Sequence, residues 1–400
     1  MSKANRLVFS LFSAASAVAL QLVAVDVSAA GFRLPNQDAY ATSRGSAFVA
    51  TADNASAVYY NPAGLGQLES EEIRLGSYLI DFDVGAEISG VDYSNNNKVQ
   101  AAPQMFYANP GERFSWGLGL YAPFGLGNEW PSSTPFRTIT EKAKIDYVTF
   151  SPVGSFQVSE QLTLGFGLTY NYTKLDIRQG IGFAPGDRIT VAARDTGMGY
   201  LGSILWQPSE RHSYGATYRS SVEHEYEGVT NVSLAPGELG TSLNLEVPDY
   251  LVLGYSFRPD RRTNIEFNVE WGGWSTVGTP ILTGTALGDI PYPFEWQDDY
   301  IYELGVSRVY GDYIYSIGYD FNKAVQTETF YNPAVSDTDS HWLNLGVASE
   351  GERFEWAISY QYGKSRREVD EALTNAAGES ANGIYRLTAH TFQFSLGMKF

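Results

Sequence analysis

The chain ends in the stretch Phe392-Gln393-Phe394-Ser395-Leu396-Gly397-Met398-Lys399-Phe400, in which apolar residues alternate with polar or small residues without interruption. Because successive side chains of a β-strand point to opposite faces, the apolar residues share one face of a predicted strand. An apolar face with a terminal aromatic residue, and no later residues to cover it, favours a bacterial outer-membrane β-barrel with lipid outside. For this stretch taken alone, an edge strand of a soluble β-sandwich is the alternative.

The other end of the chain has the three parts of a secretory signal peptide: a basic start, an apolar run and small residues for cleavage. Lys3 and Arg6 precede an apolar run over residues 7–25, and small residues end at Ala30. We predict cleavage after Ala30, so that Gly31 is the first residue of the mature chain. A single anchoring helix is the alternative, although scattered polar residues make this run less apolar than such helices usually are.

The composition agrees with a membrane barrel and disfavours several other classes of protein. Mean hydropathy is −0.21, but lipid-facing and lumen-facing residues of a barrel alternate and cancel in this average. Aromatic residues make up 14% of the chain, which suits aromatic girdles at the bilayer interfaces. A net charge of −18 disfavours a nucleic-acid partner, and the absence of cysteine excludes disulfides and thiolate sites. The four His have no zinc-binding spacing, so we expect neither a metal nor a cofactor.

Short turn signals recur along the chain, and each is followed by a run that alternates apolar and polar residues, as β-hairpins require. The six signals are Asn109–Glu112, Ser159–Gln161, Gln207–Glu210, Arg258–Asp260, Gly311–Asp312 and Gly351–Glu352. With seven longer loops they predict 14 strands, which begin near residues 72, 99, 113, 140, 161, 196, 212, 242, 261, 296, 312, 340, 353 and 386. The predicted fold is an all-β, 14-stranded antiparallel transmembrane barrel over residues 71–400. The short turns and both termini are expected in the periplasm.

Residues 31–70 do not alternate, and 16 of these 40 residues are Ala, Gly or Ser. No strand is evident beyond Ala57–Tyr60. Composition leaves two interpretations open: a disordered periplasmic tail, and a compact hatch inside the barrel lumen. A barrel of 14 strands leaves a lumen that leaks unless something fills it, so the segment is a candidate plug.

Several stretches resemble the FadL/TodX family of outer-membrane transporters. Gly31–Leu34 together with Asp53–Leu65 is similar to the hatch signature of that family, and the block Asn61-Pro62-Ala63-Gly64 is its most specific part. Further similar stretches, in the same order, are Ala122–Leu126 followed by Glu129-Trp130, Leu164–Gly167 and Thr217–Ser220. The resemblance covers essentially the whole mature chain.

The resemblance implies a 14-stranded barrel with an N-terminal hatch over residues 31–70. Such a protein carries long-chain fatty acids or other hydrophobic molecules across the outer membrane by passive diffusion, with a lateral exit at a kinked third strand. A lateral exit spares the ligand a transfer into water that costs about 0.8 kcal/mol per CH₂. Aromatic hydrocarbons and alkanes are also transported within the family, so the cargo stays open. The expected partners are this ligand, outer-membrane lipid and lipopolysaccharide, and the barrel-assembly machinery, for a monomeric protein.

The candidate site residues of the interior segment are Phe32, Asn61, Pro62, Ala63 and Gly64. The resemblance implies that Phe32 reaches the ligand pocket and that the Asn-Pro-Ala-Gly block anchors the hatch against the barrel wall. The alternatives are a frayed terminus at Phe32 and an ordinary turn at Asn61-Pro62.

A lateral opening is predicted around the end of the third strand, at Gly119, Pro123, Phe124 and Gly125. Proline cannot donate to the strand ladder, and glycine marks bends. We therefore expect a local break in pairing here, and a plain strand end leading into a loop is the alternative.

Two arginines are candidate ligand contacts. Arg219 is in phase with lumen-facing residues, and its guanidinium suits a carboxylate. An ion pair with a lumenal acid is the favoured alternative for Arg219; the candidates are Glu266, Glu270, Glu303 and Glu355. Arg178 lies near a basic ligand contact of the family, although its phase places it with the outward residues.

Three rival functions remain. An outer-membrane lipase needs a serine activated by a histidine, and His224 is the candidate base, but we expect no catalytic residues. A general porin conflicts with a plug-like segment. A structural or adhesive barrel would carry its function in loops that show no such signal.

Deletion of Phe400 is expected to reduce assembly, because the terminal aromatic strand resembles the recognition signal for barrel insertion. Heat-modifiable electrophoretic mobility of membrane fractions measures the folded barrel. An unchanged amount of folded protein would contradict this prediction.

Overall fold

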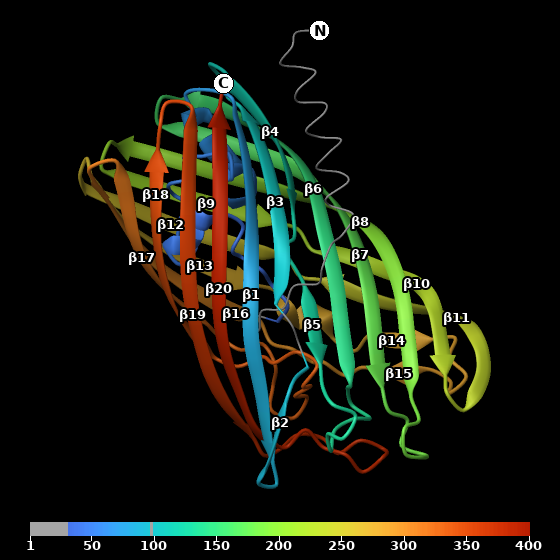
Figure 1. Cartoon of the computed structure of the whole chain (residues 1–400). Helices are drawn as coiled ribbons and strands as arrows, with labels where there is room; N and C mark the ends of the chain where they lie inside the picture. Colours follow the sequence, from blue (N-terminus) through green and yellow to red (C-terminus); the bar gives the residue numbers. More distant parts are fainter. Residues whose placement is uncertain (1–30, 97–98) are drawn as a thin grey trace.

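The computed structural model describes residues 31–96 and 99–400 (Figure 1), so the predicted signal peptide lies outside the described residues. The described strands form one antiparallel sheet that closes on itself. The seam joins β1 (Glu72–Ile88) to β20 (Gly383–Lys399), in register from Glu72 opposite Lys399 to Glu87 opposite Ile384. Because the first and last strands pair with each other, neither of them is left as a free sheet edge. Among the described residues, no helix has the length and apolarity needed to span a bilayer.

Fourteen runs of chain form the wall, which confirms the predicted fold class. In chain order they are β1; β3 (Gln100–Asn109); β4 (Phe114–Tyr121) with β5 (Leu126–Glu129); β6 (Lys142–Ser159); β7 (Leu162–Gln179); β8 (Ile189–Ser209); β9 (His212–Arg219) with β10 (Val222–Val232); β11 (Ala235–Val247) with β12 (Tyr250–Asp260); β13 (Thr263–Gly272); β16 (Asp299–Tyr310); β17 (Tyr313–Asn322); β18 (Ser340–Glu350); β19 (Phe354–Val369); and β20. The short strands β2 (Val91–Ser94), β14 (Ile281–Thr283) and β15 (Ile290–Pro291) belong to the long-loop end.

The predicted strand starts agree with the observed ones to within three residues, except for the sixth and eighth strands. These begin at Ile189 and Ala235, seven residues before the predicted positions 196 and 242. The added residues of β8 alternate in the opposite sense, with Ile189, Val191 and Ala193 buried and Arg194 exposed. They therefore lack the apolar outward face that identifies a lipid-facing strand.

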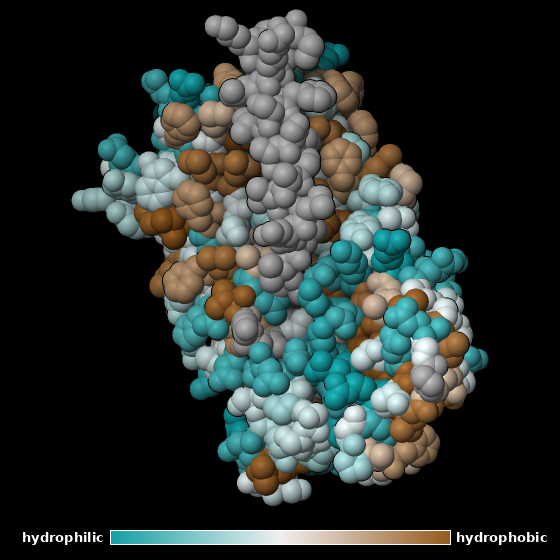
Figure 2. Space-filling view, turned by 45° about the vertical axis from the view of Figure 1, so that its right-hand side comes forward, coloured by the Kyte–Doolittle hydropathy of each residue, from teal (hydrophilic) through white to brown (hydrophobic). Residues whose placement is uncertain are grey.

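The wall is apolar outside and polar inside along most of its length. In β20, Phe392, Phe394 and Leu396 are about half exposed, whereas Gln393 and Ser395 between them are buried. Hydrophobic side chains gather on the upper part of the wall in Figure 2, and hydrophilic ones crowd much of the surface below. This banded outer face is the one that a lipid-exposed barrel requires.

Residues 31–67 lie inside the wall and carry three short helices, drawn in blue in Figure 1. They are α2 (Ala39–Ser43), α3 (Ala57–Tyr60) and η1 (Pro62–Gln67), and nearly all of their residues are buried. The expectation of a strand at Ala57–Tyr60 is wrong. This stretch is surrounded by wall, and a helical turn directs its side chains to several sides at once; α3 contacts β3, β4 and β6.

Glycines in the wall allow the interior segment to approach the strand backbone closely. A Cβ atom on Gly318 of β17 would lie 2.1 Å from the backbone nitrogen of Gly45, and one on Gly215 of β9 would lie 2.1 Å from the carbonyl oxygen of Val49. No other residue type fits at these contacts without displacing the segment.

Gly318→Ala is therefore expected to loosen the interior segment while the wall still assembles, because the added methyl group overpacks a backbone contact at a cost of about 1–3 kcal/mol. Limited proteolysis of residues 31–70 in folded protein measures the effect. Gly202→Ala in β8 is the matched control, since a Cβ atom there meets nothing within 4 Å. Equal protection of the segment in both variants would contradict the prediction.

Candidate functional site

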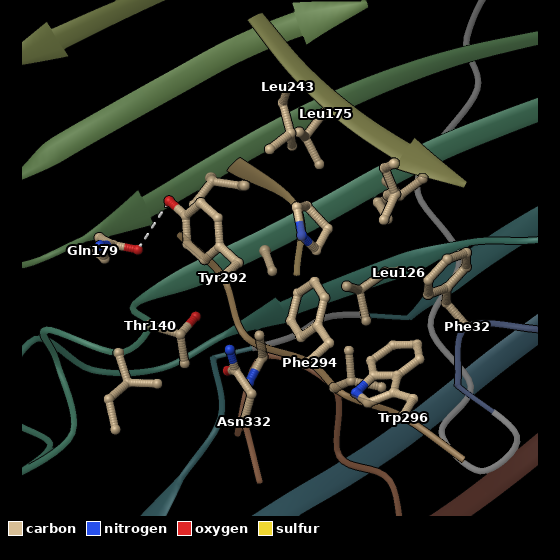
Figure 3. Close-up of a pocket in the computed structure, with 18 residues that line it drawn as sticks. Phe32, Leu126, Thr140, Leu175, Gln179, Leu243, Tyr292, Phe294, Trp296 and Asn332 are labelled. Carbon is tan, nitrogen blue, oxygen red and sulfur yellow. Dashed lines mark hydrogen bonds between the residues drawn. The ribbon is translucent and has the colours of Figure 1, made fainter. Parts of the chain in front are cut away.

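The barrel holds an apolar cavity of about 60 Å³ where the interior segment meets the inner wall and the long-loop end (Figure 3). Its rings come from Phe32, Tyr292, Phe294 and Trp296. Leu126 of β5, Leu175 of β7 and Leu243 of β11 are among the aliphatic lining residues. Thr140, Gln179 and Asn332 are its polar lining residues, and none of the lining residues is charged. A concave, mostly apolar site with a few polar groups suits a small hydrophobic ligand.

The cavity exists because the inner face of the wall changes character along the strands. In β6 the inward residues Ser151 and Thr149 give way to Ile145 and Ala143 toward the long-loop end. The neighbouring strand β7 changes in the same way, and Leu175 lines the cavity. The lumen of an outer-membrane barrel is usually polar, so this apolar stretch of inner wall points to an apolar occupant.

Phe32 closes the cavity from the side of the interior segment. Its ring packs edge-on against Trp274 at 4.9 Å between centroids and lies 5.9 Å from both Phe124 and Trp296. The structure thus places Phe32 in a pocket lining rather than in a frayed terminus.

The third strand is interrupted beside this cavity. β4 pairs with β6 as far as Tyr121 opposite Thr149, and pairing resumes in β5 at Leu126 opposite Ile145. Residues 122–125 turn inward instead, where the Leu34 N–H donates to the Pro123 carbonyl at 2.8 Å and the Gly125 N–H donates to the Phe32 carbonyl at 2.9 Å. On the other edge, β3 pairs with β4 only from Met105 to Asn109 in the described ladder.

The interruption differs in two respects from the predicted lateral opening. Gly119 lies outside it, because this residue is paired on both sides, with Phe106 and Ser151, and a Cβ atom on it would meet Val58 of α3 at 2.8 Å. Phe124 points inward and is buried, in contact with Phe32 and Tyr147. Pro123, Phe124 and Gly125 are the three predicted positions whose backbone forms the inward turn.

The Asn61-Pro62-Ala63-Gly64 block lies against β8. The Asn61 side-chain amide donates to the carbonyls of Val49 at 2.7 Å and Ile204 at 3.0 Å, and the Ala63 N–H lies 3.1 Å from the Ser203 hydroxyl. Pro62 is the first residue of η1, a position whose N–H has no partner within a helix, so proline is tolerated there. A Cβ atom on Gly64 would lie 2.2 Å from the carbonyl oxygen of Ala52. These contacts join the segment both to itself and to the wall.

Arg219 points into the lumen, as its phase predicts, but the favoured ion-pair interpretation is wrong. Its guanidinium donates to the Tyr121 hydroxyl at 3.0 Å and to the carbonyl of Tyr59 at 2.5 Å, and in the described chain it forms no ion pair. Three of the lumenal acids form ion pairs with other arginines: Glu270 with Arg33, Glu266 with Arg44 and Glu355 with Arg74. Arg219 does not line the apolar cavity.

Sequence reasoning missed Arg33 and Arg44. Both guanidinium groups are buried, and Arg33 holds Glu270 through two hydrogen bonds of 2.8 and 2.9 Å while lying 3.8 Å over the ring of Tyr250. The sequence contained a signal for these two ion pairs. An arginine in a segment that enters the lumen is buried there, and a buried arginine needs an acidic partner on the wall.

Arg178 also lies outside the cavity lining. Its guanidinium contacts Glu129 at 2.8 Å and Glu141 at 3.2 Å. Its neighbour Gln179 faces the other side of β7, lines the cavity and accepts a hydrogen bond from the Tyr292 hydroxyl at 3.2 Å (Figure 3). The predicted ligand contact, Arg178, is thus at the height of the cavity along the barrel, but the next residue, Gln179, is the one whose side chain faces inward.

His224 is held between Asp195 and Tyr147, at 2.9 Å from the carboxylate and 3.2 Å from the hydroxyl. No serine hydroxyl is bonded to this imidazole in the described structure. Over residues 31–96 and 99–400, no group of three or more potential ligands is arranged to hold a metal. Asp195 also accepts from the Glu225 N–H at 3.2 Å, so these side chains join β8 to β10 just before their ladder begins at Arg194 opposite Glu227.

A closed barrel with a lipid-facing outer band, an enclosed N-terminal segment and an apolar inner cavity defines an outer-membrane transport protein. The profile of the family described as "Outer membrane protein transport protein (OMPP1/FadL/TodX)" matches residues 20–400, and the chain belongs to this family. It is accordingly an outer-membrane protein, and its family and structural neighbours support transport of hydrophobic compounds.

Individual relatives are distant in sequence but cover most of the chain. The long-chain fatty acid transport protein of Escherichia coli O6:H1 is 22% identical over 405 residues, which cover 88% of this chain and 91% of the relative. Outer membrane protein P1 of Haemophilus influenzae is 23% identical over 392 residues, which cover 83% and 85% of the two chains.

Solved structures share the fold. A FadL homologue of Pseudomonas aeruginosa superposes with a TM-score of 0.82 at 17% identity, over 93% of this chain and all of the other. The toluene transporter TodX of Pseudomonas putida gives 0.70 at 16% identity, over 94% of this chain and 99% of the other.

Glu270→Gln is expected to loosen the N-terminal part of the interior segment, because it leaves the Arg33 charge buried without a partner, at a cost of about 3–5 kcal/mol. Hydrogen exchange of residues 31–36 in detergent measures the effect. The double variant Arg33→Met/Glu270→Gln removes both charges and should recover most of the protection. If the double variant is as exposed as Glu270→Gln, the ion pair is not the cause.

Proposed function

We propose that this protein takes up small hydrophobic molecules by passive diffusion and releases them sideways into the membrane, with long-chain fatty acids as the first candidate cargo. The observation that carries the proposal is that the uncharged cavity adjoins the interruption of the third strand. Phe32 and Leu126 line the cavity, and both belong to the chain that borders the inward turn at residues 122–125.

An apolar molecule gains free energy when it leaves water and keeps that gain as long as apolar groups surround it. A molecule in the cavity is already out of water, and a passage through the wall delivers it to lipid without a second exposure. For a long alkyl chain, avoiding that exposure saves about 0.8 kcal/mol per CH₂. The uncharged polar side chains of Thr140, Gln179 and Asn332 offer hydrogen bonds to the single polar end of a fatty acid.

A neutral aromatic hydrocarbon is the second candidate. The lining contains four aromatic rings and no cation that would pair with a carboxylate. The toluene transporter TodX has a similar fold, so this fold is compatible with an aromatic hydrocarbon as well as with a fatty acid.

In this proposal the interior segment, residues 31–70, acts as a hatch that closes the lumen to solutes. Its support is burial: the segment fills the space enclosed by the strands and bonds to the wall at Asn61, Arg33 and Arg44. The protein would act as a monomer that contacts outer-membrane lipid and lipopolysaccharide and is inserted by the barrel-assembly machinery.

Removal of residues 31–65 is expected to leave a barrel that inserts, because the wall ladder begins at Glu72. Conductance in planar bilayers should then rise sharply, since a 14-stranded wall without its hatch encloses water. A truncated barrel as closed as the intact protein would show that the segment does not close the lumen.

The lateral route is tested by a reversible cross-link. Arg33 and Phe124 face each other in an isolated antiparallel bridge, where opposed Cα atoms lie about 4.5–5.5 Å apart, within the span of a disulfide. Because the chain has no cysteine, the variant Arg33→Cys/Phe124→Cys should form one disulfide that holds the hatch against the third strand.

Uptake of labelled oleate by cells expressing the oxidised double variant is expected to fall at least about tenfold and to recover on reduction, a change of about 1.4 kcal/mol or more. The two single-cysteine variants are the controls and should not respond to reductant. Equal uptake in the oxidised and reduced double variant would exclude a route between these two segments. Labelled toluene in place of oleate separates the two cargo candidates, and a labelled sugar tests for a general porin.

A further inference from the structure

Two cations face each other on the outer surface of the wall. Lys174 of β7 lies in register with Arg194 of β8, and both side chains are exposed on the face that points away from the lumen. In the part of the chain that the structure describes, neither side chain forms an ion pair; Lys174 Nζ lies 5.6 Å from the centre of the Tyr172 ring. Like charges directly opposite each other destabilise a sheet. An anion placed between the two cations would remove this repulsion.

A second pair of opposed cations shows what the chain itself can supply. Arg366 of β19 lies in register with Arg386 of β20, and both are also exposed near the long-loop end. Glu368 lies 3.5 Å from Arg366. Glu87 and Asp92 lie 2.5 and 3.8 Å from Arg386. Acids of the protein therefore compensate the second pair.

Two acids close to Lys174 already have other partners. Asp146 lies opposite Lys174 on β6 and contacts Lys144 at 3.1 Å. Asp176, two residues further along β7, forms an ion pair with Lys142. Neither carboxylate bonds to Lys174, so the first pair of cations has no such compensation.

The two cations border a groove of about 410 Å³ on the outer wall, formed by the adjacent strands β6, β7, β8 and β10 (Figure 1). Small lining residues such as Ala192 and Gly228 leave space between the long side chains. The charged lining residues are Lys144, Asp146, Lys174, Asp176, Arg194 and Glu227. Glu227 lies opposite Arg194 on β10 but forms no ion pair with it in the described structure. The groove thus combines two uncompensated cations with one uncompensated acid.

The groove lies just beyond the lipid-facing band of the wall. Toward the short turns, the outward residues of β7 are Tyr172 and Tyr170, and those of β8 include Met198 and Tyr200. Tyr170, Met198 and Tyr200 are about half exposed or more. Outer-membrane barrels carry aromatic residues at the bilayer interfaces and direct their long loops to the cell exterior. The groove is therefore at the height of the lipid headgroups of the outer leaflet.

We propose that this groove binds a phosphate group of lipopolysaccharide in the outer leaflet. A phosphate between Lys174 and Arg194 replaces their repulsion by charge-assisted hydrogen bonds, for which the guanidinium group is well shaped. The acyl chains of the same lipid then lie along the apolar band of β7 and β8. The proposal specifies the lipopolysaccharide contact of the proposed function, and it is independent of the cargo and of the route through the wall.

Binding of purified lipid A tests the site without a transport assay. The full mature chain is refolded in detergent without lipopolysaccharide, and native mass spectrometry measures its dissociation constant for bisphosphorylated lipid A. Lys174→Gln/Arg194→Gln is expected to raise this constant at least about tenfold, which corresponds to roughly 1.4 kcal/mol. Arg366→Gln/Arg386→Gln is the matched control and should change it less than about twofold, because acids already compensate those exposed arginines. Equal constants in the parent protein and Lys174→Gln/Arg194→Gln would overturn the proposal.

Glu227→Gln should change the affinity in the opposite direction. This substitution removes the uncompensated acid of the groove, which repels a phosphate, so the dissociation constant is expected to fall about two- to threefold. Weaker binding by Glu227→Gln would show that an acid holds the lipid in place of the two cations, and it would overturn the proposal.

A change of lipid tests the site without any substitution and decides the question if a variant does not fold. Lipid A without its two phosphates should bind the parent protein at least about tenfold more weakly than the bisphosphorylated form. Equal binding of the two lipids would overturn the proposal. Inorganic phosphate at the concentration of the lipid should not displace lipid A, and displacement would assign the groove to free phosphate instead. Loss of oleate uptake with intact lipid A binding would concern transport and not this groove.

Discussion

The structure depends on one constraint, which is that every backbone N–H and C=O facing lipid needs a hydrogen-bond partner. Closing β1 on β20 meets this constraint for the wall as a whole. The third strand breaks it locally, since residues 122–125 leave the ladder of β6. The interior segment supplies two partners there, through Leu34 and Phe32, so the strand leaves its ladder where another part of the chain bonds to its backbone. The interruption and the segment inside the barrel are therefore one structural solution.

Buried ion pairs hold that segment in one position. Arg33 and Arg44 of the segment each meet an acid of the wall, and Arg74 of the wall meets Asp38 of the segment. Each of these side chains is nearly inaccessible to water. Such pairs add little net stability over apolar packing, but a displaced segment would leave several charges unpaired. Apolar contacts among small residues such as Ala would tolerate sliding. The charges select a single register between the segment and the wall.

Much of the wall was predictable, because lipid outside and a polar lumen inside impose a period of two on each strand. The prediction failed where that contrast disappears: β8 and β11 continue beyond the apolar band, and their early residues have no apolar outward face. It also failed by one residue at Arg178 and Gln179, where the resemblance indicated a level and not a face. The partners of Arg219, the helix at Ala57–Tyr60 and the position of Gly119 depend on how a non-periodic segment packs in a closed space. No local pattern encodes that packing.

The seam has a consequence for the order of assembly. The Ala39 N–H donates to the Ser395 hydroxyl across 356 residues of chain, and the Gln393 amide donates to the carbonyl of Asn36. The first part of the mature chain is thus bonded to the last strand. These bonds can form only when β20 has been placed, and contacts between the two ends of a sequence form late in folding. Docking of the segment therefore belongs to the last steps of assembly, together with the closing of the seam.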